Sequence, residues 1–295
     1  MTERSLINIA MSINSAYAPH AAVMMSSLLD HTEHPVAFYI FSTGLADSVK
    51  NKLGKRLSQK DQIHFVEFSP EELPENSRIY ETLYRFLIPK YLKSLDRVLY
   101  LDVDVIIQKD IADVYFTSFE GNILAAVPEC SPVFTSEFIS KLKEGKKNYF
   151  NAGILLMNLS KLTEKDSEKW IDTFSSNPSK FAYRDQCVLN WYYEDYKHWP
   201  LIYNVVSRYY VSNDDFKRLA RKKGVSIEGI EDPYIIHYTM PECKPWHIRC
   251  IHPKRSLYLH YLLKTPWWSR IFRISIGRFV LRSINLIKMG KFKIA

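Results

Sequence analysis

Apolar, β-branched segments alternate with segments of helical pattern through the first 107 residues, and this alternation restricts the fold more than any other feature. It is typical of βαβ units and predicts an α/β fold with a mostly parallel sheet and flanking helices. Strands are expected at residues 6–12, 36–43, 62–68, 97–107, 122–129, 150–159 and 233–239. Helices are expected at residues 18–32, 46–58, 78–92 (interrupted or ended near Pro89), 164–176 and 184–194.

The composition argues against several classes of protein. The chain has 295 residues, of which 46% are hydrophobic, enough for one large core or two modest domains. Its 9 glycines form no GxGxxG or P-loop motif. The first ten residues lack the apolar segment of a signal peptide, and no run of 18 apolar residues predicts a membrane span. Four scattered cysteines indicate reduced thiols, and hence a cytoplasmic protein.

Two carboxylates interrupt the most apolar of the predicted strands. Asp102 and Asp104 lie in RVLYLDVDVII, where a strand buried on both faces is expected. In a regular strand, residues i and i+2 point to the same side, and ligands collect at the carboxyl ends of strands in such sheets. Because buried carboxylates repel each other, a divalent cation between them would make both tolerable. The alternative is that D-x-D is only a solvated turn or cap.

His237 is the candidate third ligand, because it follows the apolar run YII at another strand end. Two carboxylates and one imidazole suit Mn²⁺ or Mg²⁺, and Mn²⁺ is the better match to nitrogen. The alternative for a single histidine is a hydrogen-bonded residue of the core or of a sheet edge.

Four segments carry a resemblance to a known family: VLYLDVDVII, YFNAGILLMNL, YRDQCVLN and HYTMPECKPWH, in this order and at these separations. Together they resemble retaining glycosyltransferase family 8, especially the bacterial branch that extends lipooligosaccharide or lipopolysaccharide with galactose or glucose from UDP-sugars. The likeness runs from about Leu6 to Trp246. It implies a GT-A fold, a Rossmann-like α/β sheet with a metal-dependent nucleotide-sugar site, over residues 1–252.

The resemblance implies a donor site around the metal. Asp102, Asp104 and His237 would hold the cation, which in turn holds the two phosphates of UDP. Lys244 would contact the diphosphate, and Arg85 would reach across the donor; the alternatives are a solvated lysine and a helix-face ion pair. The implied UDP-sugar-binding set is Asn14, Tyr17, Arg85, Asp102, Val103, Asp104, Asn151, Ala152, Gly153, Asp185, Gln186 and Lys244.

The resemblance also implies a sugar pocket. Asn151 would line it through its amide and Gly153 by close backbone approach, although NAG is also a common turn sequence. Asp185 would accept hydrogen bonds from sugar hydroxyls, with a helix cap as the alternative. Gln186 would face the anomeric carbon opposite the leaving group, so that Gln186, Asp185 and Arg85 are the candidate catalytic residues. Glu129 falls where the family has an acid near the acceptor.

The chain departs from the family pattern at two functional positions. Many relatives have a second acid directly after the glutamine, and here Cys187 stands there, more consistent with a buried structural cysteine than with a nucleophile. Where relatives usually begin the nucleotide loop with Asp, the chain has Asn14, whose amide both donates and accepts. Tyr17 is a candidate to stack on the base or simply to pack at a helix start.

The resemblance therefore implies a metal-dependent retaining hexosyltransferase that moves glucose or galactose from a UDP-sugar to a glycan hydroxyl. The acceptor hydroxyl would attack on the face that UDP leaves, with a UDP phosphate oxygen taking its proton, or the reaction would be a double displacement through a residue near Gln186 or Asp185. The rival hypothesis is a non-catalytic protein that binds sugar nucleotides or polyanions through a degenerate site.

The C-terminal region is strongly basic. The net charge is +8, but 12 of the 40 Lys and Arg residues and no acidic residue follow Glu242. Residues 267–288 have the pattern of a basic amphipathic helix flanked by tryptophans, which suits an anionic membrane surface. The alternatives are binding to nucleic acid and packing in the groove of a partner protein. We therefore expect residues 253–295 to be a helical membrane-association tail that places the enzyme on the inner face of the cell membrane, near a lipid-linked acceptor.

Overall fold

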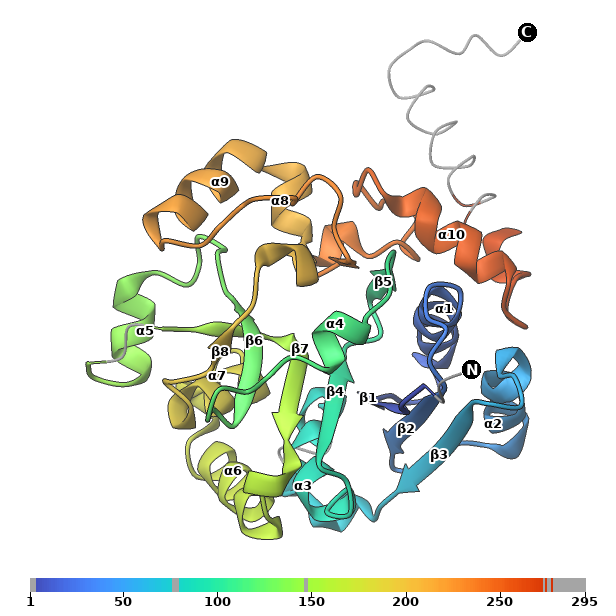
Figure 1. Ribbon diagram of the computed structural model, residues 1–295, viewed down its shortest axis with the longest axis horizontal. Coiled ribbons are helices and arrows are strands. Elements are labelled where there is room, and N and C mark those ends of the chain that lie inside the picture. Colours follow the sequence, from blue (N-terminus) through green and yellow to red (C-terminus); the bar gives the residue numbers. More distant parts are fainter. Residues whose placement is uncertain (1–3, 76–79, 146–147, 273, 275–276, 278–295) are drawn as a thin grey trace, which may run out of the picture.

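The computed structural model describes residues 4–75, 80–145 and 148–272, together with 274 and 277. A seven-stranded sheet in the order β3-β2-β1-β4-β7-β6-β8 forms its centre, and β5, β10 and β9 form a smaller sheet (Figure 1). The strands are β1 (Ile7–Ser12), β2 (Val36–Ser42), β3 (Gln62–Glu67), β4 (Arg97–Leu101), β5 (Val105–Ile107), β6 (Leu124–Pro128), β7 (Phe150–Asn158), β8 (Lys197–His198), β9 (Val205–Val206) and β10 (Ile235–His237). In the large sheet, β7 alone runs antiparallel to its two neighbours, so the expected mostly parallel α/β sheet is confirmed.

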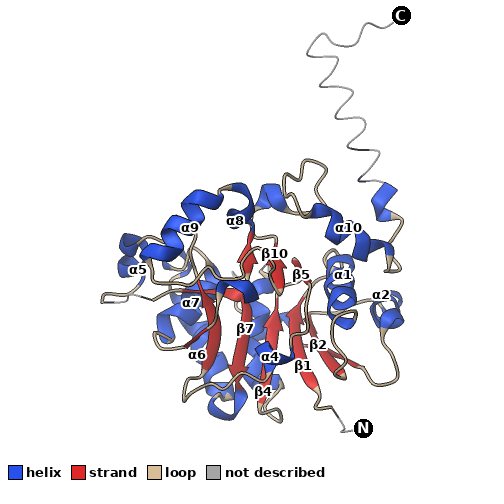
Figure 2. Ribbon diagram, turned by 45° about the horizontal axis from the view of Figure 1, so that its top comes forward, coloured by secondary structure: helices blue, strands red, loops and turns tan. Residues whose placement is uncertain are grey.

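Helices cover both faces of the large sheet (Figure 2). The α-helices are α1 (Ala18–Leu29), α2 (Asp47–Leu53), α3 (Ile88–Tyr91), α4 (Ala112–Tyr115), α5 (Ser136–Leu142), α6 (Glu164–Ser176), α7 (Arg184–Tyr192), α8 (Ser207–Val211), α9 (Asn213–Lys222) and α10 (Arg255–Leu263). Successive residues of β1 point to opposite faces: Ile9 packs in the cluster of Met24 from α1, and Ala10 in the cluster of Trp170 from α6. The apolar runs of the strands are therefore buried on both sides.

The prediction of one continuous strand over residues 97–107 is wrong. β4 ends at Leu101, and β5 begins at Val105 and leaves the large sheet to pair antiparallel with β10. The break places Asp102 and Asp104 in a connection at the sheet's edge rather than inside a strand covered on both faces, where charged groups are costly. The regular i, i+2 strand geometry expected for the two aspartates therefore does not apply.

The helix expected at residues 78–92 is divided. A 3₁₀ helix, η4 (Glu81–Leu87), leads directly into the single turn of α3. Pro89 is the second residue of α3, where its missing N–H costs nothing. This segment delivers Arg85 from η4 into the centre of the molecule, with its side chain only 2% exposed.

The C-terminal segment begins with a helix that belongs to the core. α10 packs against α1, where Tyr258 Oη lies 2.6 Å from His20 Nδ1. Most of the amphipathic helix predicted for residues 267–288 lies outside the described residues. Within the part of the chain that the structure describes, no helix is both long and apolar enough to cross a membrane.

Candidate active site

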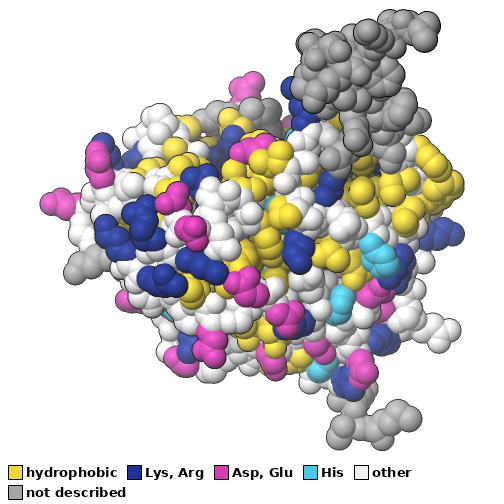
Figure 3. All heavy atoms as spheres, turned by 90° about the horizontal axis from the view of Figure 1, so that it is seen from above, with side chains coloured by type: hydrophobic (Ala, Val, Ile, Leu, Met, Phe, Trp, Pro, Cys, Tyr) yellow, Lys and Arg dark blue, Asp and Glu magenta, His cyan; other side chains and the backbone are white. Residues whose placement is uncertain are grey.

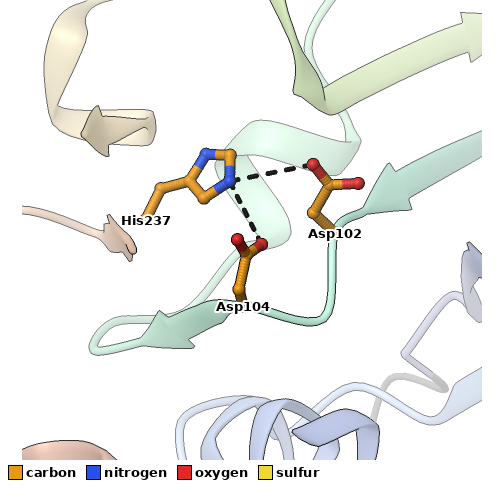
Figure 4. Close-up of side chains that lie close together, drawn as sticks. All are labelled: Asp102, Asp104 and His237. Atoms are coloured by element: carbon orange, nitrogen blue, oxygen red, sulfur yellow. Dashed lines mark ion pairs between the residues drawn. The ribbon is translucent and has the colours of Figure 1, made fainter. Parts of the chain in front are cut away.

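Asp102, Asp104 and His237 converge at the edge of the large sheet (Figure 4). His237 Nε2 lies 3.2 Å from Asp104 Oδ1 and 3.7 Å from Asp102 Oδ2, and one ligand atom of each residue falls within 4.8 Å of the others. The antiparallel pairing of β10 with β5 brings them together, because it sets His237 opposite Val105, the residue after Asp104. Residues more than 130 positions apart thus form one candidate cation site.

The orientation of His237 fits a bound cation. Asn204 Nδ2 donates to Asn151 Oδ1 at 2.9 Å, so Asn204 Oδ1 faces His237 Nδ1, also at 2.9 Å. A carbonyl oxygen only accepts, so Nδ1 carries a proton, and Nε2, which faces the two carboxylates, is the nitrogen available to a metal ion. The two carboxylates need a positive charge beside them, which a proton on Nε2 or a bound cation supplies, and two carboxylate oxygens with one imidazole nitrogen suit Mn²⁺ or Mg²⁺.

Asn204 is a site residue that the sequence reasoning missed. It is 1% exposed and begins a buried chain of side-chain hydrogen bonds, which continues from Asn151 Nδ2 to Glu129 Oε2 at 2.9 Å. These hydrogen bonds join His237, a candidate metal ligand, to Glu129, the acid that was expected near the acceptor. The only sign of Asn204 in the sequence is that a polar residue directly precedes the apolar pair of β9.

Gly153 is required by the close approach of the metal ligands. A Cβ atom at this position would lie 2.3 Å from His237 Cε1 and 2.6 Å from Asp102 Oδ2. These distances are far below van der Waals contact, so only glycine fits. In addition, Gly153 O accepts from Asp102 N at 2.7 Å, which fixes the backbone where β4 ends.

Arg85 lies beneath the site as a buried cation. It donates to Asp102 Oδ1 at 2.7 Å, its Nε lies 3.1 Å from Asp185 Oδ2, and its guanidinium lies 4.0 Å above the Tyr100 ring. Burial raises the pKa of Asp185, although Arg85 opposes this shift. Burial opposes the charge on Arg85, but Asp185, Tyr100 and Asp102 together raise its pKa. The ion pairs of Arg85 are buried inside the candidate site rather than on an exposed helix face, and the pair with Asp102 positions that carboxylate.

Lys244 reaches the site from the segment after β10. Its ammonium contacts Asp104 Oδ2. Burial alone would raise the pKa of Asp104, but Lys244 and His237 hold it well below its usual range. Both candidate metal ligands from the D-x-D segment are therefore paired with a basic side chain, Asp102 with Arg85 and Asp104 with Lys244.

Two cavities meet at the aspartates. The narrow cavity, of about 190 Å³, is lined by Ser12, Tyr17, Glu81, Thr82, Tyr100, Asp102, Val103, Asp104 and Lys244. The wide cavity, of about 630 Å³, contains the candidate ligands and also Glu129, Asn151, Gln186 and Arg208. Asp102, Asp104 and Lys244 line both cavities, so a cation bound to the two aspartates would lie where the cavities meet.

The structure does not bring Asn14 to the wall of the narrow cavity. Its Oδ1 accepts from the amides of Ala16 and Tyr17, and its Nδ2 donates to Glu81 Oε1 at 2.5 Å. Glu81 lines the cavity instead, and sequence reasoning missed it. Tyr17 is 42% exposed at the cavity's rim, where a planar ligand can reach its ring.

Gln186 and Asp185 lie together at the start of α7. Gln186 Oε1 accepts from Ala152 N at 3.1 Å, and the residue lines the wide cavity. The neighbouring Cys187 is fully buried, and its Sγ lies 3.2 Å from Tyr149 Oη. Burial raises the pKa of Cys187 above that of an ordinary thiol, and a buried thiol is a poor nucleophile.

The fold and this site define an α/β protein with a candidate cation and ligand site at the carboxyl edge of the sheet. The family model for glycosyl transferase family 8 matches residues 8–250. The chain therefore belongs to this family and is a glycosyltransferase, with a sugar nucleotide as donor and an acceptor for the sugar.

Individual relatives are distant in sequence but cover most of the chain. It is 26% identical over 275 residues to a lipopolysaccharide 1,2-glucosyltransferase of Escherichia coli K12, an alignment that covers 88% of this chain and 79% of the relative. It is 27% identical over 284 residues to general stress protein A of Bacillus subtilis 168, covering 90% and 96%. The structure of the galactosyltransferase LgtC with donor and acceptor sugar analogues matches with a TM-score of 0.74 at 22% identity, covering 88% and 96%. This likeness confirms the predicted GT-A fold.

Proposed function

We propose that this glycosyltransferase transfers glucose or galactose, with retention, from a UDP-sugar to a hydroxyl of a glycan. The observation that carries the proposal is the convergence of Asp102, Asp104 and His237 at the junction of the two cavities. In this arrangement the narrow cavity takes the nucleotide and the wide cavity takes the transferred sugar and the acceptor. Relatives named as a glucosyltransferase and a galactosyltransferase support a hexose.

Asp102, Asp104 and His237 would hold Mn²⁺ or Mg²⁺. The cation, when bound, neutralises negative charge on the departing diphosphate. Lys244 would also stabilise the departing diphosphate. Its ammonium now pairs with Asp104, and a metal cation on Asp104 would take over this role and leave the ammonium free for a phosphate oxygen. Arg85 keeps Asp102 in place from below, and is therefore a positioning residue in this proposal.

The narrow cavity offers polar and aromatic groups for the nucleotide. The Glu81 carboxylate can accept a hydrogen bond from the uracil N–H. Asn14 donates to this carboxylate and holds it in place. Tyr17 offers an exposed ring for stacking against the base. We propose that this pair compensates for the missing aspartate of the nucleotide loop.

The surroundings of Asp185 favour attack of the acceptor on the face that UDP leaves. A double displacement needs a free carboxylate, but Asp185 is 6% exposed and paired with Arg85. Cys187 is buried behind it. In our proposal Gln186 lies beside the anomeric carbon on the face opposite UDP, and a phosphate oxygen of UDP accepts the proton of the acceptor hydroxyl.

The acceptor is proposed to be lipid-linked at the inner face of the cell membrane. Three large apolar side chains near the C-terminus are half exposed: Leu263, Trp268 and Phe272. Figure 3 shows apolar side chains gathered at the edge where α10 lies. Combined with the excess of Lys and Arg after Glu242, this surface suits an anionic leaflet, at roughly 1 kcal/mol for each basic residue near it.

Release of UDP from a panel of UDP-sugars tests the proposal. Hydrolysis and transfer should require a divalent cation, disappear with excess chelator and return with Mn²⁺. Asp104→Asn should remove nearly all activity while thermal unfolding stays close to that of the wild type. A folded wild-type protein that binds sugar nucleotides but releases no UDP with any donor or acceptor would favour the rival, a non-catalytic binding protein.

The membrane surface has a separate test. Truncation after Thr265 retains α10 and should release the protein from anionic vesicles while hydrolysis of the UDP-sugar persists. Salt should weaken binding of the full-length chain only in part, because the apolar side chains are not screened. Full-length protein that does not bind anionic vesicles at low salt would contradict this part of the proposal.

A further inference from the structure

The wide cavity is lined by an arginine, Arg208, that forms no ion pair among the described residues. The buried acids of the cavity have other partners: Asp102 pairs with Arg85, Asp104 with Lys244, and Glu129 accepts from Asn151 and from the Ser131 amide, while Glu242 is exposed. Within the described residues, the buried Nε of Arg208 has no hydrogen-bond acceptor.

An unpaired arginine is unusual in such a place. The guanidinium cannot lose its charge in a protein, and a buried donor without an acceptor costs about 1–3 kcal/mol. The local structure keeps Arg208 close to the metal ligands, since the neighbouring Ser207 donates to the backbone oxygen of His237 at 3.3 Å. The missing acceptor is therefore expected to come from a ligand of the wide cavity.

A second arginine, Arg184, lines the wide cavity and strengthens the argument. Its guanidinium lies 4.0 Å above the Tyr80 ring, and the described part of the chain gives it no carboxylate partner. The first turn of α7 holds it with a left-handed backbone, φ 45°, which is rare outside glycine and is retained only where the surroundings enforce it.

The positive charge continues outside the cavity. Lys223, at the end of α9, donates to the backbone oxygens of Glu129 and Phe134 in the loop that borders the cavity. Arg221 and Lys222 precede it and are exposed. Figure 3 shows basic side chains gathered on the side of the molecule where α9 lies. Asp214 and Asp215 are also exposed on α9 and offset part of this charge, so Arg208, and not this surface, is the group expected to select the anion.

The location of Arg208 indicates that its ligand is a group of the acceptor and not the diphosphate of the donor. Lys244 and both aspartates line the two cavities, so the diphosphate lies at the junction. Arg208 lines the wide cavity, together with Glu129, and not the narrow cavity of the nucleotide, whereas Arg184 also lines a smaller cavity beside Arg85 and Asp185. The anion that Arg208 would bind therefore belongs to the acceptor, which enters the wide cavity.

We propose that the acceptor of this enzyme carries a negatively charged group, a phosphate or a carboxylate, near the hydroxyl that receives the sugar, and that Arg208 binds this group. The inference rests on the proposed function, because it assigns the wide cavity to the acceptor. A bidentate, charge-assisted contact of this kind is among the stronger hydrogen-bonded interactions in proteins. It would make acceptor charge a determinant of specificity.

The test compares matched acceptors in the full-length protein with Mn²⁺ and the preferred UDP-sugar. The probes are methyl glucoside, methyl glucoside 6-phosphate and methyl glucuronide, which separate a phosphate from a carboxylate. The wild type should prefer one anionic probe by kcat/KM, and Arg208→Gln should lower the ratio of anionic to neutral kcat/KM by about 10- to 100-fold. Arg208→Lys should recover part of that ratio. Arg218→Gln, an exposed arginine of α9, is the matched control and should leave the ratio unchanged.

Three results would overturn the proposal. Equal kcat/KM for neutral and anionic probes in the wild type would show that charge is not recognised. An unchanged ratio in Arg208→Gln would show that Arg208 does not bind the anion. A large loss of UDP affinity in Arg208→Gln would assign the guanidinium to the diphosphate instead. Calorimetric binding of the same probes to the UDP–Mn²⁺ complex tests Arg208 even if no transfer occurs, so failure of the proposed reaction is distinguishable from failure of this inference.

Discussion

Gly153→Ala should damage the cation site while the fold persists. The new Cβ would lie 2.3 Å from His237 Cε1 and 2.6 Å from Asp102 Oδ2. To restore an ordinary contact of about 3.4 Å, the imidazole must retreat by roughly 1.1 Å, whereas metal–ligand distances tolerate only about 0.2 Å. Two of the three candidate ligands are displaced at once. We expect Mn²⁺ affinity to fall by about 10- to 100-fold or more, as when the support of a ligand is lost.

The cost to stability should be smaller. Overpacking of this kind typically costs about 1–3 kcal/mol, which leaves a chain of this size folded. Gly54→Ala is the matched control, because no heavy atom lies within 4 Å of its Cβ position and its φ of −73° suits alanine. It should leave Mn²⁺ binding unchanged and stabilise the protein slightly.

The assay is titration of the apoprotein with Mn²⁺, followed by electron paramagnetic resonance of the free ion, with thermal unfolding measured in parallel. Gly153→Ala that binds Mn²⁺ as tightly as the wild type would refute the reasoning, because the clash would then have been absorbed without moving a ligand. Equal loss of binding in Gly54→Ala would point to a general effect of the substitutions instead.

Three further predictions concern other parts of the molecule. Asn204→Ala removes the acceptor for His237 Nδ1 and should weaken Mn²⁺ binding by about 10-fold or more, measured by the same titration; wild-type affinity would contradict it. Cys187→Ser should change kcat by less than about twofold, whereas Gln186→Ala should lower it more than it lowers UDP affinity; a covalent sugar adduct on Cys187 in mass spectrometry would overturn this. Burial lowers the pKa of His20 from 6.5 to about 3, so between pH 6.5 and about 3 the unfolded chain binds more protons than the folded protein. The folded state therefore loses stability as the pH falls through this range, by about 1.4 kcal/mol per pH unit. Urea unfolding of His20→Gln should show a shallower loss over this range, and an unchanged pH dependence would argue against the buried neutral imidazole.

The sequence by itself determined the class of fold and the kind of chemistry. The alternation of apolar runs with helical patterns predicts the α/β sheet, because each period is encoded in neighbouring residues. Asp102 and Asp104 within an apolar run predict a cation, because two buried like charges need a counter-charge wherever the chain runs. His237 was predicted as a candidate third ligand from its place at a strand end and from the family resemblance, and the structure brings it to the two aspartates. These inferences depend on short stretches of the chain.

Only the tertiary structure decided how the site is held and which groups face it. The break after Leu101 exists because β5 pairs with β10, and no local pattern distinguishes that pairing from a continued strand. Asn204 lies 33 residues from His237 and 53 from Asn151, so its bridging role requires the packing of three separate segments. The same holds for Arg85, which the packing of η4 buries under Asp102. It also holds for Arg208, which has no ion-pair partner in the part of the chain that the structure describes. The sequence gives the type of each side chain. Its partners and its burial are determined only when distant segments pack together, because each contact depends on the positions of several segments at once.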